Sequence, residues 1–195
     1  MRCLGSSDDG EAKLVQDFFR LIDRYTPQLV SWNGSGFDLP VLHYRALIHG
    51  VVAARYWEGG DEDRDFRYNN YLSRYHARHT DLMDVLAMYQ GRAVAPLDEL
   101  AKLCGFAGKV GMAGDEVWDA YCAGQIDNIR DYCETDVVNT YLLFCRFQKM
   151  RGLLSTAAYA AEMDLIRQTL QQAQAPHWRK FLAAWASQTH AADQT

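Results

Sequence analysis

The sequence predicts an α/β protein in which a few parallel strands accompany mostly helical structure. Residues 28–83 show the pattern of a strand, a helix and a second strand, and strands in that order pair in parallel through a crossover. From Leu97 onward the apolar patterns are helical. Because two parallel strands alone make a poor sheet, we expect the sheet to continue in a segment absent from this chain, which then lacks its N-terminal part.

The first half of the chain supplies both predicted strands. Its expected elements are a helix at Glu11–Tyr25, a strand at Gln28–Trp32, a helix at Phe37–His49, a strand at His79–Met83 and a helix ending at Tyr89. Either Asp8 or Asp9 can cap the first helix. The turn Asn33–Gly36 follows the first strand directly and carries two glycines.

Residues 56–77 are rich in Asp, Arg, Asn and Tyr and show no clear period, which predicts a long polar excursion or lid. Basic and aromatic residues are interleaved in this segment and just after it: Arg64, Arg67, Tyr68, Tyr71, Arg74, Tyr75 and Arg78. Such a mixture suits a single nucleic-acid strand, through phosphate contacts and base stacking. A solvated loop, whose charge is offset by Asp61, Glu62, Asp63 and Asp65, is the alternative.

The second half is expected to be helical. The predicted helices are Leu97–Cys104, Glu116–Ala123, Ile126–Met150, Ser155–Gln172 and Pro176–Ser187. In the long helix the expected buried positions are Ile129, Cys133, Val137, Leu143, Phe144 and Phe147. We interpret residues 1–195 as one domain with a helical C-terminal part at 115–187.

Composition narrows the class of protein. Apolar residues make up 49% and charged residues 23%, as in soluble globular proteins, and no apolar run is long enough to span a membrane. No signal pattern begins the chain, so a cytoplasmic location is expected. The net charge of −5 argues against a module that coats nucleic acid through its phosphates. The five cysteines lack metal or redox spacing and are expected to be buried thiols.

The first motif of chemical interest is Asn33-Gly34-Ser35-Gly36-Phe37-Asp38, placed after a predicted strand. Glycines let the backbone turn sharply and let a ligand approach closely. An aspartate in the first turn of a helix is also favoured by the helix dipole, so Asp38 as an ordinary helix-start residue is the alternative.

The second motif is Tyr132-Cys133-Glu134-Thr135-Asp136, inside the long helix. Tyr132 and Asp136 are four residues apart and share one helix face. An aspartate on an apolar face is costly unless it is paired or bound to a metal. Asp136 can therefore be a metal ligand with the Tyr132 hydroxyl presented to the same point. The alternative is a buried hydrogen bond between these two side chains, without a metal.

In this order, and about a hundred residues apart, the two motifs resemble the second and third exonuclease motifs of the DnaQ-like (DEDD) superfamily, in its tyrosine subclass. The closest likeness is to the predicted 3′–5′ exonucleases related to the proofreading domain of family B DNA polymerases. Further similar text is Pro27–Gly34, His79–Asp84 and Leu97–Phe106, and the likeness runs from about Leu4 to Trp185.

The resemblance implies a ribonuclease H-like exonuclease fold with two Mg²⁺ or Mn²⁺ ions about 4 Å apart. It assigns metal binding and catalysis to Asp38 and Asp136, and the orientation of the attacking water to Tyr132. It assigns contacts with the terminal nucleotide of a single-stranded 3′ end to Asn33, Gly34 and Phe37. Asp81 is either a supporting carboxylate or a structural cap.

One part of the family pattern is missing. The first motif, Asp-x-Glu on an apolar strand, should lie many tens of residues before Asn33, and only 32 residues precede it. The local Asp9-Gly10-Glu11 lies in a polar turn, where helix capping explains it. A two-metal site that lacks carboxylates binds hard cations weakly. We therefore expect little nuclease activity from this chain alone.

Three functions remain open from the sequence: a 3′–5′ exonuclease on single-stranded DNA, a related exoribonuclease, and a non-catalytic nucleic-acid-binding remnant of the fold. The intact second and third motifs favour the first, and the missing Asp-x-Glu favours the last. The motifs do not separate deoxyribose from ribose, and the sequence does not predict the oligomeric state.

Overall fold

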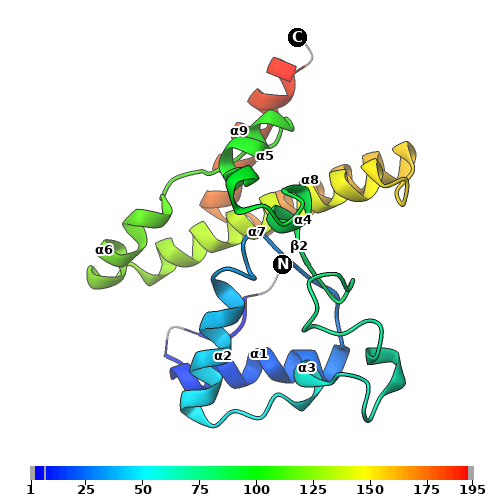
Figure 1. Ribbon diagram of the computed structural model, residues 1–195. Coiled ribbons are helices and arrows are strands. Elements are labelled where there is room, and N and C mark those ends of the chain that lie inside the picture. Colours follow the sequence, from blue (N-terminus) through cyan, green and yellow to red (C-terminus); the bar gives the residue numbers. More distant parts are fainter. Residues whose placement is uncertain (1–2, 7, 193–195) are drawn as a thin grey trace. The chain divides into compact units, whose positions relative to one another are not determined.

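The computed structural model describes residues 3–6 and 8–192 (Figure 1). The chain divides into two compact units, residues 1–94 and 95–195, which are described separately. Within the described residues there is one two-stranded parallel sheet among many helices, which agrees with the predicted α/β class of few strands. No helix in the described part is long and apolar enough to cross a membrane.

The first unit contains the sheet. Its elements are α1 (Glu11–Tyr25), β1 (Leu29–Ser31), α2 (Asp38–His49), α3 (Ala54–Trp57), η1 (Arg64–Phe66), β2 (His79–Asp81), α4 (Leu82–Leu86) and η2 (Gly91–Ala93). The strands pair in parallel, with Leu29 opposite His79 and Ser31 opposite Asp81. Both strands therefore end at the same edge, and the first motif begins there.

The core of this unit forms between α1, α2 and the segment that follows them. The apolar stripe of α1 buries Phe19 and Ile22, and Phe19 meets Tyr56 edge-to-face. The predicted cap of α1 was wrong: Gly10 is the N-cap residue and no side chain caps the helix. Asp9 instead accepts a hydrogen bond from the Ser6 amide at 2.9 Å.

Residues 56–77 are irregular, as predicted, apart from the end of α3 and η1. The segment is nevertheless anchored, because Phe66 and Tyr71 are buried in the core with Tyr56. Tyr71 stacks on Tyr56 and donates a hydrogen bond to the Pro27 carbonyl at 2.6 Å. Its apolar side chains thus fix to the core a stretch whose composition is mostly polar.

The second unit is helical. Its elements are α5 (Leu97–Leu103), η3 (Gly114–Glu116), α6 (Val117–Cys122), α7 (Ile126–Met150), α8 (Thr156–Ala173) and α9 (Pro176–Ala192). Buried side chains from three of these helices form much of its core: Val138, Leu142 and Leu143 of α7, Met163 and Leu170 of α8, and Trp178, Phe181 and Trp185 of α9.

The bounds of α7 match the prediction, but its buried face is rotated. Leu143 is buried as expected, whereas Val137 is 60% exposed and Cys133 is also exposed. Polar Thr135 and Asn139 are buried instead, because they find hydrogen-bond partners: the Asn139 amide donates to the Gly108 carbonyl at 2.7 Å and its oxygen accepts from the Gly108 amide at 3.2 Å. Of the five cysteines only Cys145 is buried, which corrects the buried-thiol prediction.

Candidate functional site

The first motif forms a turn at the end of β1 that is held by Asp81, the last residue of β2. The Asp81 carboxylate accepts hydrogen bonds from the backbone amides of Asn33, at 2.9 Å, and Ser35, at 2.8 Å. Asp81 is 5% exposed. Asp81 occupies the N-cap position of α4, but its side chain does not cap that helix. The carboxylate therefore braces the turn, and does not serve as the helix cap considered from the sequence.

The turn is tight enough to require its first glycine. Gly34 is buried, and a Cβ atom there would lie 2.5 Å from the Cβ of Ser31. Asn33 adopts a left-handed conformation with φ of 63°, a region that costs energy for a residue with a side chain. Phe37 is 64% exposed. This arrangement presents the Asn33 and Phe37 side chains to solvent on a rigid support.

A histidine supports the same edge of the sheet. The imidazole Nε2 of His79 lies 2.8 Å from the Ser31 hydroxyl oxygen. Burial lowers the pKa of His79, so the ring is neutral near pH 7. It adds no positive charge beside Asp81.

Asp38 is the first residue of α2 and lies beyond the turn. Partial desolvation raises the pKa of its carboxyl group, and the negative charge of Asp81 raises it further, against a hydrogen bond from its own backbone. A cation bound between two neighbouring carboxylates would offset the repulsion between their negative charges. The first unit thus brings together Asn33, Gly34, Phe37, Asp38 and Asp81.

The second motif forms a pair on one face of α7. The Tyr132 hydroxyl donates a hydrogen bond to the Asp136 carboxylate. The other oxygen, Oδ1, is buried and has no hydrogen-bond partner among the described residues. Burial raises the pKa of both side chains, and in Tyr132 the Asp136 charge adds to the effect. The pair is thus the hydrogen bond named as the alternative, with one carboxylate oxygen left over.

A loop after α5 carries a cation that acts on Asp136. The Lys109 ammonium lies 5.4 Å from the centre of the Tyr132 ring, and its charge lowers the pKa of Asp136. The loop is held by Asp98, whose carboxylate accepts from the Lys109 amide at 2.6 Å and pairs with Lys102 at 2.8 Å. Lys109 therefore only partly offsets the burial of the carboxylate.

The local Asp-x-Glu sequence is fully engaged in the first unit. Asp9 pairs with Lys13 at 3.0 Å. Glu11 pairs with Arg45 and with His49, and these hydrogen bonds lower its pKa to about 2. The Glu11 contacts tie α1 to α2, whereas the Asp9 contact stays at the start of α1, and both carboxylates are used in structural ion pairs.

Asp38 lies in the first unit and Asp136 in the second. The meeting of these two carboxyl groups in one metal site stays a prediction. Each unit by itself contains a carboxylate with a raised pKa next to its expected partner residues.

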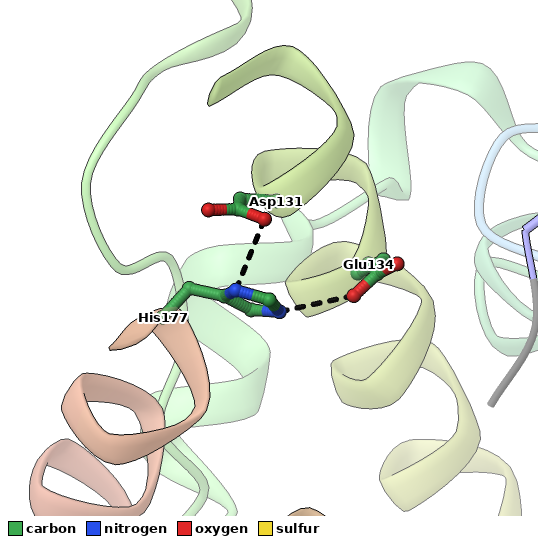
Figure 2. Close-up of side chains that lie close together, drawn as sticks. All are labelled: Asp131, Glu134 and His177. Carbon is green, nitrogen blue, oxygen red and sulfur yellow. Dashed lines mark hydrogen bonds and ion pairs between the residues drawn. The ribbon is translucent and has the colours of Figure 1, made fainter. Parts of the chain in front are cut away.

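The sequence reading did not single out a third cluster, formed by Asp131, Glu134 and His177 (Figure 2). Asp131 and Glu134 are three residues apart on α7, and His177 lies in the first turn of α9. The imidazole Nδ1 lies 3.0 Å from Asp131 Oδ1, and Nε2 lies 3.0 Å from Glu134 Oε2. The three-residue spacing of Asp131 and Glu134 is visible in the sequence and places both acids on one helix face. Nothing in the sequence near them indicates His177 as their partner.

These three side chains are the only His, Cys, Asp and Glu group with the geometry to hold a metal among the described residues. Their ligand atoms lie within 4.8 Å of one another. Each ring nitrogen lies 3.0 Å from its own carboxylate oxygen, so the imidazole bridges the two acids. We interpret the cluster as a clamp between α7 and α9.

We expect His177→Ala to lower the free energy of unfolding by about 1–2 kcal/mol, because it removes the ring that lies 3.0 Å from both Asp131 on α7 and Glu134 on α7 and so joins α9 to α7. Urea unfolding measures this change. Asp164→Ala is the control, since it removes a carboxylate that is 68% exposed and should cost under about 0.5 kcal/mol. Equal effects of the two variants would contradict the clamp.

The chain belongs to the family of predicted 3′–5′ exonucleases related to the exonuclease domain of PolB, whose pattern it matches over residues 1–185. It is 26% identical over 138 residues to a DNA polymerase of Archaeoglobus fulgidus. That alignment covers 68% of this chain and 17% of the polymerase, so the chain corresponds to a small part of its relative. No solved structure matches the chain.

Proposed function

We propose that the protein is a 3′–5′ exonuclease of the ribonuclease H-like fold, which hydrolyses phosphodiester bonds at single-stranded DNA 3′ ends by two-metal catalysis. The observation that carries the proposal is the buried, unpartnered Oδ1 of Asp136 beside the Tyr132 hydroxyl. Buried polar atoms are almost always hydrogen-bonded, and an exception needs an explanation such as an ion.

The residues present fit a divalent cation. Asp136 offers a buried carboxylate oxygen that no donor occupies in the described part of the chain, and Asp38 offers a carboxylate whose pKa is raised by desolvation and by Asp81. Mg²⁺ and Mn²⁺ prefer such oxygen ligands. When bound, the ions would polarise the phosphodiester and favour departure of the 3′ oxygen.

The chain's own side chains position the reactants in this proposal. Burial and the Asp136 charge raise the pKa of Tyr132, so its hydroxyl stays protonated and can orient a water but not act as a base. Phe37, exposed at the turn, packs on the terminal base. Asn33 and Gly34 contact the same nucleotide through the turn that Asp81 holds.

The proposed site has fewer carboxylates than the family pattern, because Asp9 and Glu11 are engaged in ion pairs. We therefore expect weak binding of Mn²⁺ and slow hydrolysis. Single-stranded oligonucleotides labelled at the 5′ end, incubated with excess protein and Mn²⁺, test this. The expected product is a ladder shortened from the 3′ end, absent in EDTA.

Mn²⁺ titration followed by calorimetry tests the convergence of the two motifs without relying on activity. If Asp38 and Asp136 share one site, Asp38→Asn and Asp136→Asn should each weaken Mn²⁺ binding at least about tenfold. If neither variant changes Mn²⁺ binding, or if cleavage starts at the 5′ end, the proposed function is wrong.

Two alternatives are separated by the same assay. Faster digestion of an RNA strand than of the matching DNA strand would favour an exoribonuclease. Binding of the strand and of Mn²⁺ without any shortened product would favour a non-catalytic nucleic-acid-binding form of the fold.

A further inference from the structure

The segment from Phe66 to Arg78, here called the arginine–tyrosine loop, is closed on itself by side-chain hydrogen bonds. The Asn70 amide donates to His76 Nδ1 at 3.0 Å, and the Arg78 amide donates to Asn69 Oδ1 at 3.0 Å. Because Phe66 and Tyr71 are buried at 0% and 3% exposure, the loop is fixed to the core of the first unit. Its outward side chains are therefore held on a rigid support.

The loop has an unusual charge for this protein. From Phe66 to Thr80 the sequence contains three arginines and no acidic residue, although the whole chain carries −5. Arg78 is used internally, with its guanidinium 4.0 Å from the centre of the Phe66 ring. Arg67 and Arg74 are exposed, and neither forms an ion pair with a carboxylate in the described part of the chain. Two guanidinium groups are thus free to meet an anion.

Exposed tyrosines follow both of these arginines directly. Tyr68 is 80% exposed and Tyr75 is 77% exposed. The Arg67 guanidinium lies 5.9 Å from the centre of the Tyr68 ring, and Tyr75 meets Tyr89 edge-to-face at 5.2 Å. The Arg74 guanidinium lies 5.4 Å from the centre of the Tyr89 ring, so each half of the loop presents a positive charge next to an aromatic face.

We propose that the arginine–tyrosine loop binds single-stranded nucleic acid, with Arg67 and Arg74 contacting phosphates and Tyr68 and Tyr75 stacking on bases. Every base offers a π-face, and only unpaired bases can stack on a side chain in this way. A second exposed aromatic pair, Trp118 and Tyr121 of α6, lacks this chemistry because Asp115, Glu116 and Asp119 surround it in the sequence. The proposal rests on the proposed exonuclease function and names where the strand is held.

Fluorescence anisotropy with a labelled oligothymidylate in EDTA measures binding without hydrolysis. We expect the double variant Arg67→Ala/Arg74→Ala to bind at least about tenfold more weakly, and its plot of log affinity against log salt to flatten by about 1.4, or 0.7 per lost phosphate contact. We expect Tyr68→Ala/Tyr75→Ala to weaken binding about tenfold or more with an unchanged salt slope. These four side chains are exposed, so far-ultraviolet circular dichroism should stay that of the wild type.

The matched control is Arg24→Ala/Tyr25→Ala. Arg24 lies 5.0 Å from the centre of the Tyr25 ring on α1, so this pair has the same chemistry beside the acidic Asp23. It should bind as the wild type does. Wild-type affinity and salt slope in the Arg67/Arg74 variant would overturn the proposal, as would equally tight binding of duplex DNA.

The outcome is separable from that of the proposed function. If the protein hydrolyses the strand from the 3′ end and the loop variants bind as the wild type does, strand binding by the loop is refuted and the proposed exonuclease function is not. Strand binding that depends on the loop, in a protein that hydrolyses nothing, would support the loop proposal and refute the proposed exonuclease function.

Discussion

Asp136→Asn is expected to abolish metal-dependent hydrolysis and, at the same time, to raise the free energy of unfolding of the metal-free protein near neutral pH by about 1 kcal/mol. The wild-type carboxylate has one oxygen bonded to Tyr132 and one buried without a partner among the described residues. A neutral amide in the same place costs less to bury than a charge. A gain in stability together with a loss of function is the behaviour of a site shaped for a ligand.

The stabilisation should depend on pH in a defined direction. Burial raises the pKa of Asp136 in the folded state above its ordinary value of 3.8. Between pH 3.8 and this raised pKa, the folded state therefore holds the Asp136 proton more tightly than the unfolded chain does. Wild-type stability therefore falls as pH rises through that window. The difference between Asp136→Asn and the wild type should vanish below it and be complete above it.

Urea unfolding at several pH values measures this effect. Asp164→Asn is the control, because Asp164 is exposed on α8 and pairs with Arg167 at 3.2 Å. Tyr132→Phe should be destabilising in the wild type but close to neutral in Asp136→Asn, since the hydroxyl then supports no buried charge. A less stable Asp136→Asn at neutral pH would contradict the reading of Oδ1 as an unsatisfied ligand atom.

Asp81→Ala should destabilise the first unit by about 3 kcal/mol. Its carboxylate is buried and accepts hydrogen bonds from the amides of Asn33 and Ser35. Removing it leaves two donors without partners at a point where Asn33 is already in a costly left-handed conformation. The turn that carries Phe37 and Asp38 should then lose its fixed geometry.

Hydrogen exchange reports directly on this turn. In Asp81→Ala the protection of the Asn33 and Ser35 amides should fall, and binding of Mn²⁺ through Asp38 should weaken with it. Asp84→Ala, which removes a carboxylate three residues away on α4, is the matched control. Asp81→Asn should recover part of the loss, because its carbonyl can accept one of the two bonds. Unchanged amide protection in Asp81→Ala would show that the turn holds itself.

The sequence alone was sufficient for those features that depend on nearby residues. The helices Glu11–Tyr25 and Ile126–Met150 begin and end where apolar periodicity and helix propensity place them, and the two short strands pair in parallel as their order requires. The family could also be recognised, because the order and spacing of its motifs are properties of the chain. The hydrogen bond between Tyr132 and Asp136 follows from their spacing of four residues on one helix.

The tertiary structure decided which partner each polar side chain meets, since partners distant in sequence leave no local pattern. Strand pairing set Asp81 opposite Ser31 and turned a possible helix cap into the brace of the first motif. The packing of α9 on α7 brought His177 between two acids. Tertiary packing also decided which tyrosines of the loop are buried: Tyr71 is buried, whereas Tyr68 and Tyr75 are exposed. The burial of a ring depends on which residues the folded chain packs against it, and these can lie far away in the sequence.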